Sequence, residues 1–146
     1  MALPASRGQP AGMTNLASPG KQIIDPGWGY EKDFGYSQAV RTGDLVIVAG
    51  QMPVDSHCNL VAEGDIVGQT RQVFENMKVV LAAAGLTLDD LVEIVSYHTD
   101  MQDLHAVVEV KADYIKGSFP AWTAVGVTAL ALPGQRLEMK AMARAR

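Results

Sequence analysis

Two stretches of the chain decide the fold that we expect: Phe119-Pro-Ala-Trp-Thr-Ala-Val-Gly-Val127 and Arg136-Leu-Glu-Met-Lys-Ala-Met-Ala143. Each contains a run of residues typical of strands, placed at Trp122–Val127 and Arg136–Ala143. The segment Leu132-Pro-Gly134 between them has the composition of a turn. We therefore expect these two strands to pair as a hairpin that closes the domain.

Upstream, the sequence predicts a second hairpin and a separate strand. Ser37–Arg41 and the buried run Leu45–Ala49 are separated by the turn residues Thr42-Gly-Asp44. Pro53–Gly64 has no apolar periodicity and is predicted to be a surface loop. Leu91–His98 alternates well enough to be a single strand.

Two helices are predicted between these strands. After Asp65, which can cap a helix, apolar residues recur at three- and four-residue spacing until Gly85, which can end it. A second helix is predicted from about Asp103, ended by Gly117. In the connection before Leu91–His98, Asp89-Asp90 is interpreted as the capped first turn of a short helix.

The element order β-β-α-β-α-β-β predicts an α+β domain, a two-layer sandwich of a mixed sheet with two helices on one face. No helix is left for the other face, although Leu45–Ala49 and Trp122–Val127 are apolar on both sides. An apolar face of this size is normally an oligomer interface. A monomer with a covering loop would need more chain than the sequence has.

Length and composition suit one compact domain. The chain has 146 residues, 48% of them hydrophobic, which is enough to bury a core. Residues 1–20 are rich in Ala, Pro, Ser and Gly and are predicted to be a disordered tail before a single domain at 21–146. No apolar run approaches the roughly 18 to 20 residues that span a bilayer, so no membrane association is expected.

The net charge and the cysteine content indicate which binding partners and which cellular compartment to expect. A net charge of −4 provides no positive field to gather phosphates, so no nucleic-acid partner is expected. The single cysteine, Cys58, cannot form an internal disulfide and fits a reducing, cytoplasmic setting. Its neighbour His57 points the other way along an extended loop, so Cys58 is interpreted as an ordinary exposed thiol.

Metal and cofactor motifs are missing from the sequence. His57, His98 and His105 lack the spacing and the acidic neighbours of a metal site, and we interpret them as polar residues satisfied by the fold. Gly27-Trp-Gly29 neither follows a strand nor leads into a helix, so it does not predict a phosphate-binding loop. The sequence therefore predicts no metal and no cofactor.

Short motifs spread over Gly35–Ala143 are specific when taken together. In chain order they are Tyr36-Ser-Gln38, Gly43-Asp44, Ala49-Gly-Gln-Met-Pro53, Gln69-Thr-Arg-Gln72, Asn76, Ala83-Ala-Gly85, Thr99-Asp-Met101, Phe119-Pro-Ala121 and Leu137-Glu-Met139. With them the chain resembles the reactive-intermediate deaminases, the RidA or YjgF family. The resemblance implies a chorismate mutase-like fold and a trimer whose sheets meet around a central barrel. It also implies hydrolysis of an imine or enamine to a keto acid and ammonia in a cleft between subunits, without metal or cofactor.

The resemblance also implies roles for three residues. Tyr36 would line the cleft, the backbone of Gly50 would approach the ligand, and Glu138 would hold or activate water. A carboxylate can orient water towards an imine carbon and relay protons, so the role of Glu138 is chemically sound. Taken without the resemblance, Glu138 is equally well a solvated strand residue paired with Arg136 or Lys140.

The chain departs from the family pattern at Trp122, because the family's deaminases have a carboxylate-binding arginine after Pro-Ala. Tryptophan offers an apolar face and one N–H donor, which suits stacking on an aromatic, conjugated or cationic ligand. It suits a core or subunit-interface position equally well. Arg41 or Arg136 could replace the missing cation, but nothing in the sequence places either in the cleft.

Two functions therefore stay open. The first is a divergent imine or enamine hydrolase in which Glu138 manages water and Trp122 shapes the pocket. The second is a non-catalytic trimer that binds a small metabolite between subunits. Ribonuclease activity, also attached to the family, is disfavoured by the acidic balance and by the absence of a suitable histidine pair.

Overall fold

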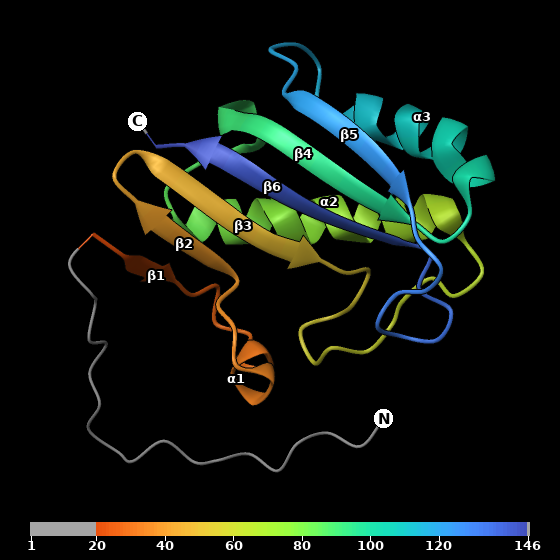
Figure 1. Ribbon diagram of the computed structural model, residues 1–146, viewed down its shortest axis with the longest axis horizontal. Coiled ribbons are helices and arrows are strands. Elements are labelled where there is room, and N and C mark those ends of the chain that lie inside the picture. The colour runs from red at the N-terminus through yellow and green to blue at the C-terminus, as the bar shows by residue number, and fades with distance from the viewer. Residues whose placement is uncertain (1–19, 146) are drawn as a thin grey trace.

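The computed structural model describes residues 20–145, so the predicted tail at 1–20 lies outside the described residues except for Gly20. Within this part, six strands form one mixed sheet in the order β1-β2-β3-β6-β4-β5 (Figure 1). The strands are β1 (Gln22–Ile24), β2 (Ala39–Thr42), β3 (Leu45–Gln51), β4 (Leu91–His98), β5 (Ala121–Gly126) and β6 (Leu137–Arg144). The helices are α1 (Glu31–Phe34), α2 (Ile66–Ala83) and α3 (Leu104–Tyr114), with 3-10 turns η1 (Leu88–Asp90) and η2 (Met101–Asp103). The predicted α+β class is confirmed.

The first predicted hairpin is present. Strands β2 and β3 pair antiparallel, with Thr42 opposite Leu45 across a two-residue turn. Gly43 in that turn has φ 60°, a left-handed conformation that glycine adopts without a steric penalty. Strand β1 and the short helix α1 were not predicted from the sequence, and β1 extends the sheet beyond β2.

Both predicted helices are present, and the ends of α2 follow the expected signals, whereas α3 ends at Tyr114, before the predicted stop at Gly117. The Asp65 side chain accepts a hydrogen bond from Gly68 N at 3.0 Å at the start of α2. Gly85, with φ 74°, follows its last turn. The predicted short helix at Asp89-Asp90 is η1, where Thr87 and Asp90 form a capping box.

The predicted closing hairpin is wrong. Strand β5 pairs only with β4, and in parallel, whereas β6 lies between β3 and β4 and is antiparallel to both (Figure 1). Helix α3 connects β4 to β5, and such a helical crossover returns the next strand parallel to the first. The segment after β5 then carries the chain past the end of β4 into the centre of the sheet.

The two faces of the sheet differ in what covers them. Leu137 and Met139 of β6 are fully buried against the helices, while Glu138 and Lys140 alternate with them and face the other way. The helix-free face also carries Ile47, whose side chain is 45% exposed. No helix of residues 20–145 combines the length and the apolar character needed to cross a membrane.

Candidate functional site

Glu138 lies on the helix-free face in the middle of the sheet, opposite Tyr97 of β4. Burial raises the pKa of its carboxyl group above the usual value. Among the described residues, no side chain forms an ion pair or hydrogen bond with Glu138. Of the two partners expected for a solvated pair, Arg136 instead binds Asp103, and Lys140 forms no ion pair with Glu138. The carboxyl group is therefore half-buried and free to accept a ligand or a proton.

Gly50 lies directly beside this carboxyl group. Val48 of β3 pairs with Ala141 and Gln51 pairs with Met139, so Ala49 and Gly50 together oppose a single residue of β6. This is a β-bulge, which often re-aims side chains near functional sites. A Cβ atom built on Gly50 would lie 2.9 Å from Glu138 Cδ and closer still to Oε1. The bulge and the missing side chain therefore make the space that the carboxyl group occupies.

Tyr36 is linked to the end of β3 by hydrogen bonds through the side chains of Gln38 and Gln51. Gln38 Nε2 donates to Tyr36 Oη at 3.4 Å, and Gln51 Nε2 donates to Gln38 Oε1 at 3.0 Å. Gln51 follows Gly50 in the chain and is buried, and its Oε1 has no hydrogen-bond partner among the described residues. Burial raises the pKa of Tyr36, with a smaller contribution from Tyr30, so its phenol stays neutral and able to donate. These hydrogen bonds connect Tyr36 to Gln51, which follows Gly50 in the chain.

Cys58 lies near this cluster and is half-buried, so the expectation of an exposed thiol is corrected. Burial, followed by the charge of Asp55, raises the pKa of Cys58. A raised pKa disfavours the thiolate, which is the nucleophilic form. The geometry therefore gives no support to nucleophilic catalysis by Cys58.

Trp122 lies on the other side of the sheet from Glu138. It pairs with Ile94, which is fully buried beneath the helices. Its Nε1–H donates to Ser96 Oγ at 2.8 Å, and this oxygen lies 2.7 Å from His98 Nε2. Burial lowers the pKa of His98, which favours the neutral ring in this core position. Within one chain, the structure does not bring Trp122 to Glu138.

The two arginines considered as replacements are both engaged elsewhere. Arg136 binds Asp103 with two nitrogens, and its Nε lies 2.9 Å from Asp103 Oδ2. Arg41 Nε donates to the carbonyl of Gly43 at the tip of the first hairpin. Gln51 was not predicted from the sequence, although it lies within the motif that contains Gly50. Ser96 was not predicted either, because hydrogen bonding between neighbouring strands leaves no local pattern.

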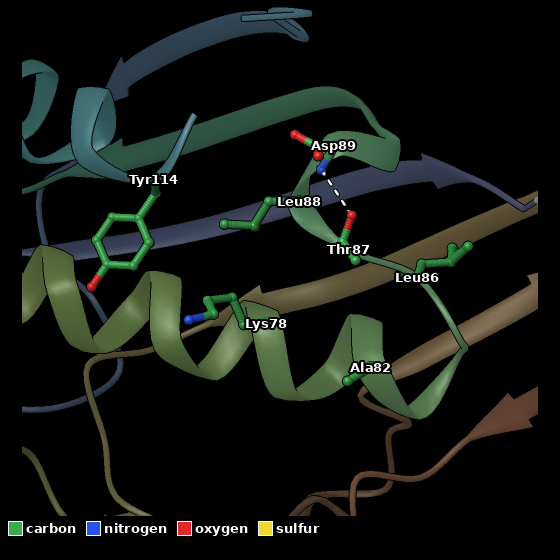
Figure 2. Close-up of a pocket in the computed structure, with 7 residues that line it drawn as sticks. All are labelled: Lys78, Ala82, Leu86, Thr87, Leu88, Asp89 and Tyr114. Atoms are coloured by element: carbon green, nitrogen blue, oxygen red, sulfur yellow. Dashed lines mark hydrogen bonds between the residues drawn. The ribbon is translucent and has the colours of Figure 1, made fainter. Parts of the chain in front are cut away.

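A separate cavity of about 330 Å³ lies between α2 and η1. Figure 2 shows Lys78 and Ala82 on α2 facing Leu88, with Tyr114 from the end of α3 at one side. None of the predicted site residues lines it. Across residues 20–145, no three or more His, Cys, Asp or Glu side chains are grouped as a metal site.

Comparison with known proteins identifies proteins that resemble this chain in sequence and in fold. A family described as Endoribonuclease L-PSP matches residues 31–145. The RutC family protein YjgH of Escherichia coli is 42% identical over 111 residues, which are 75% of this chain and 82% of YjgH. A 2-iminobutanoate/2-iminopropanoate deaminase of Mus musculus is 33% identical over 108 residues, 74% of this chain and 79% of the mouse protein. The solved structure of Rv2704 of Mycobacterium tuberculosis, a member of the YjgF/YER057c/UK114 family, has a TM-score of 0.74 at 35% identity, covering 86% of this chain and 99% of that one.

Proposed function

The chain belongs to the RidA/YjgF/YER057c/UK114 family, and from this membership we propose that it is a divergent hydrolase of imines or enamines. Its relatives include deaminases of 2-iminobutanoate and 2-iminopropanoate. The single observation that supports this function best is the Glu138 carboxyl group, which is half-buried, has a raised pKa and has no ionic partner among the described residues.

A carboxyl group in this state suits the hydrolysis of a C=N bond. Ionised Glu138 takes a proton from water while the water oxygen bonds to the imine carbon. The same proton then passes to the nitrogen, which gives an amino alcohol. Ionised Glu138 next takes the hydroxyl proton and passes it to the amino group, so that the C–N bond breaks and ammonia leaves as the C=O bond of the keto acid forms. The raised pKa favours this role, because proton transfer in both directions is easiest when the pKa approaches the working pH.

The neighbouring groups provide positions for the substrate. The Glu138 carboxyl group occupies the space that a side chain at Gly50 would fill, so it lies beside the Gly50 backbone. Tyr36 remains a neutral phenol and is held by Gln38. In this proposal the phenol and the backbone orient the substrate, while Glu138 carries out proton transfer.

The helix-free face supports a proposal about assembly. Ile47 is 45% exposed there and Val125 is 37% exposed, and Met142 pairs with Ile47 on the same face. We infer that copies of the chain associate through this face, and the family resemblance favours a homotrimer with the cleft between subunits. An association of this kind removes apolar side chains from water.

The proposed activity is tested with 2-iminobutanoate generated in situ, by measuring 2-oxobutanoate above the rate of spontaneous hydrolysis. The expected result is catalysed product formation that Glu138→Gln lowers by about 10²-fold or more. Glu93→Gln is the matched control, because Glu93 lies on the same face but opposite Met142. Product formation by Glu138→Gln at the wild-type rate would exclude the proposed mechanism. Ligand-induced stabilisation without any product would instead support a non-catalytic metabolite-binding protein.

A further inference from the structure

Two amide side chains of α2, Gln69 and Asn76, are buried under the sheet. Gln69 is fully buried and Asn76 is 7% exposed, although both are polar. They are seven residues apart, about two turns of an α-helix, so both lie on the same side of α2. Burial of a polar side chain costs free energy unless its hydrogen bonds are formed. The partners of these two amides therefore indicate what they do.

Asn76 holds the chain that follows β3. Its Nδ2 donates to Met52 O at 3.0 Å and to Val54 O at 2.9 Å. Its Oδ1 accepts a hydrogen bond from Gln72 Nε2 at 2.8 Å, one turn earlier in α2, and this bond orients the amide. Met52 comes two residues after Gly50. The end of β3 is therefore attached to α2 just beyond the β-bulge.

Gln69 holds the chain that leads into β6. Its Oε1 accepts a hydrogen bond from Arg136 N at 2.9 Å, and its Nε2 donates to Gly134 O at 2.9 Å. The same Nε2 lies 3.4 Å from Ala62 O. Arg136 comes two residues before Glu138. The start of β6 is therefore attached to the same side of α2 as the end of β3.

The β-bulge makes these two attachments important for the site. A bulge disrupts the ladder and leaves its extra residue unpaired, so strand pairing alone does not determine how closely Gly50 approaches Glu138. The approach is close, because a Cβ atom on Gly50 would lie 2.9 Å from Glu138 Cδ. The regular ladder of Leu45–Val48 holds the two strands on one side of the bulge. The two amides of α2 hold them on the other.

We propose that Gln69 and Asn76 form a clamp that positions the Glu138 carboxyl group beside Gly50. The clamp lies on the helix-covered face of the sheet and the carboxyl group on the helix-free face, so the two amides act through the main chain of β3 and β6 and do not touch the substrate. They are positioning residues. The inference rests on the proposed function, because a small displacement of Glu138 slows the reaction only if this group transfers the protons.

The clamp is tested with Gln69→Met and Asn76→Leu, which stay close to the original size and remove the hydrogen bonds. With 2-iminobutanoate generated in situ, we expect each variant to lower kcat at least about ten-fold and to change KM less than about two-fold, because no substrate contact is removed. Thr70→Val is the matched control and should keep the wild-type kcat. Thr70 is also fully buried on α2, but its Oγ1 donates to Ile66 O of the same helix.

A second measurement does not depend on turnover. Carbon-13 NMR of protein labelled at glutamate Cδ follows the titration of Glu138, whose signal is assigned with Glu138→Gln. Without the clamp the carboxyl group is free to move into water, so its pKa should fall towards the usual glutamate value in Gln69→Met and Asn76→Leu. Thr70→Val should titrate like wild type. A Glu138 titration that is the same in both clamp variants and in wild type would overturn the proposal.

Loss of buried hydrogen bonds can also prevent folding, which circular dichroism detects. If Asn76→Leu does not fold, Asn76→Ser replaces it. The serine hydroxyl donates only one hydrogen bond, and the smaller side chain leaves room for water to bind the carbonyl groups of Met52 and Val54. The strand end is then held less tightly in a folded protein, and the pKa of Glu138 should fall in the same direction.

The two measurements separate this inference from the proposed function. Wild-type protein without turnover would contradict the hydrolase, and the NMR titration would still decide the clamp. Catalysed product formation, with the Glu138 titration unchanged in both clamp variants, would leave the hydrolase standing and contradict the clamp.

Discussion

The carboxyl group of Glu138 lies against the main chain of Gly50, where a β-bulge interrupts the pairing of β3 and β6. The glycine has an ordinary backbone conformation and is absent from the residues with positive φ. Glycine is therefore needed at this position because it has no side chain, and the Glu138 carboxyl group occupies the space where a Cβ atom would lie. Several properties of the site depend on this contact.

Gly50→Ala should displace the Glu138 carboxyl group without unfolding the protein. The new Cβ atom would overlap Glu138 Oε1, and the flexible glutamate end can move away. We expect a destabilisation of about 1 kcal/mol and a loss of activity close to that of Glu138→Gln. Urea unfolding and turnover measure the two effects. Gly126→Ala is the control, because its Cβ atom would meet only Met101; equal activity losses in both variants would contradict the specific role of Gly50.

The stability of the protein should depend on pH through Glu138. Burial raises the pKa of this group in the folded state, so the folded protein keeps the proton to a higher pH than the unfolded chain does. Between the two pKa values the folded state binds more protons, and the free energy of unfolding falls as the pH rises. Glu138→Gln should therefore be more stable than wild type at about pH 8 and equally stable below about pH 4. Thermal unfolding across this range checks the sign, and a pH-independent difference would contradict it.

Ser96→Ala should destabilise the protein by about 1–3 kcal/mol, because it leaves the Trp122 N–H and His98 Nε2 without their shared partner. A double-mutant cycle with Trp122→Phe isolates the pair, and we expect a coupling energy of about 1 kcal/mol. Thr123→Val is the control, since Thr123 is exposed on the strand that carries Trp122. Additive effects in the cycle would mean that the hydrogen bond contributes nothing.

Ile47→Lys should disrupt assembly, because it places a charge on the apolar helix-free face where copies are proposed to meet. Light scattering after size exclusion should show a change from trimer to monomer. Val79→Lys is a matched control, since Val79 on α2 is 44% exposed and Ile47 is 45% exposed. A wild-type protein that is already monomeric would contradict the proposed interface.

The protein should not bind RNA strongly, despite the description of its family as an endoribonuclease. With 16 acidic and 12 basic residues, it lacks the positive surplus from which phosphate binding draws its affinity. Fluorescence anisotropy with a labelled RNA at low and moderate salt checks this. Tight binding that weakens steeply with salt, together with cleavage that Glu138→Gln abolishes, would show that the prediction is wrong.

Local sequence signals predicted the elements well. The strand at Leu91–His98 has the predicted bounds, and Asp65 caps α2 as expected. Both depend on neighbours in the chain, which a sequence displays directly. The interpretation of Asp89-Asp90 as capping residues succeeded for the same reason, since a capping box lies within four residues.

Long-range pairing was not predictable in this way. A turn-like segment before β6 suggested a hairpin with β5, yet β6 pairs with β3 and β4. The candidate site was also predicted only in part. Gly50 and Glu138 lie together as predicted, but Trp122 lies on the opposite face of the sheet. The contact between the Lys111 ammonium group and the Trp122 ring was not predicted either, because it forms only when the end of α3 lies beside β5.

The central place of β6 has a consequence for the order in which the molecule becomes functional. Strands β1–β3 and β4–β5 have no pairing with each other, so the sheet stays in two halves until β6 docks between them. Such late, distant pairing slows folding, because the entropy of closing long loops is lost before the contacts form. Since β6 also carries Glu138, the docking of this strand brings the Glu138 carboxyl group beside Gly50 as it completes the core. If the proposed hydrolase activity is measured during refolding, it should therefore appear only when β6 has docked.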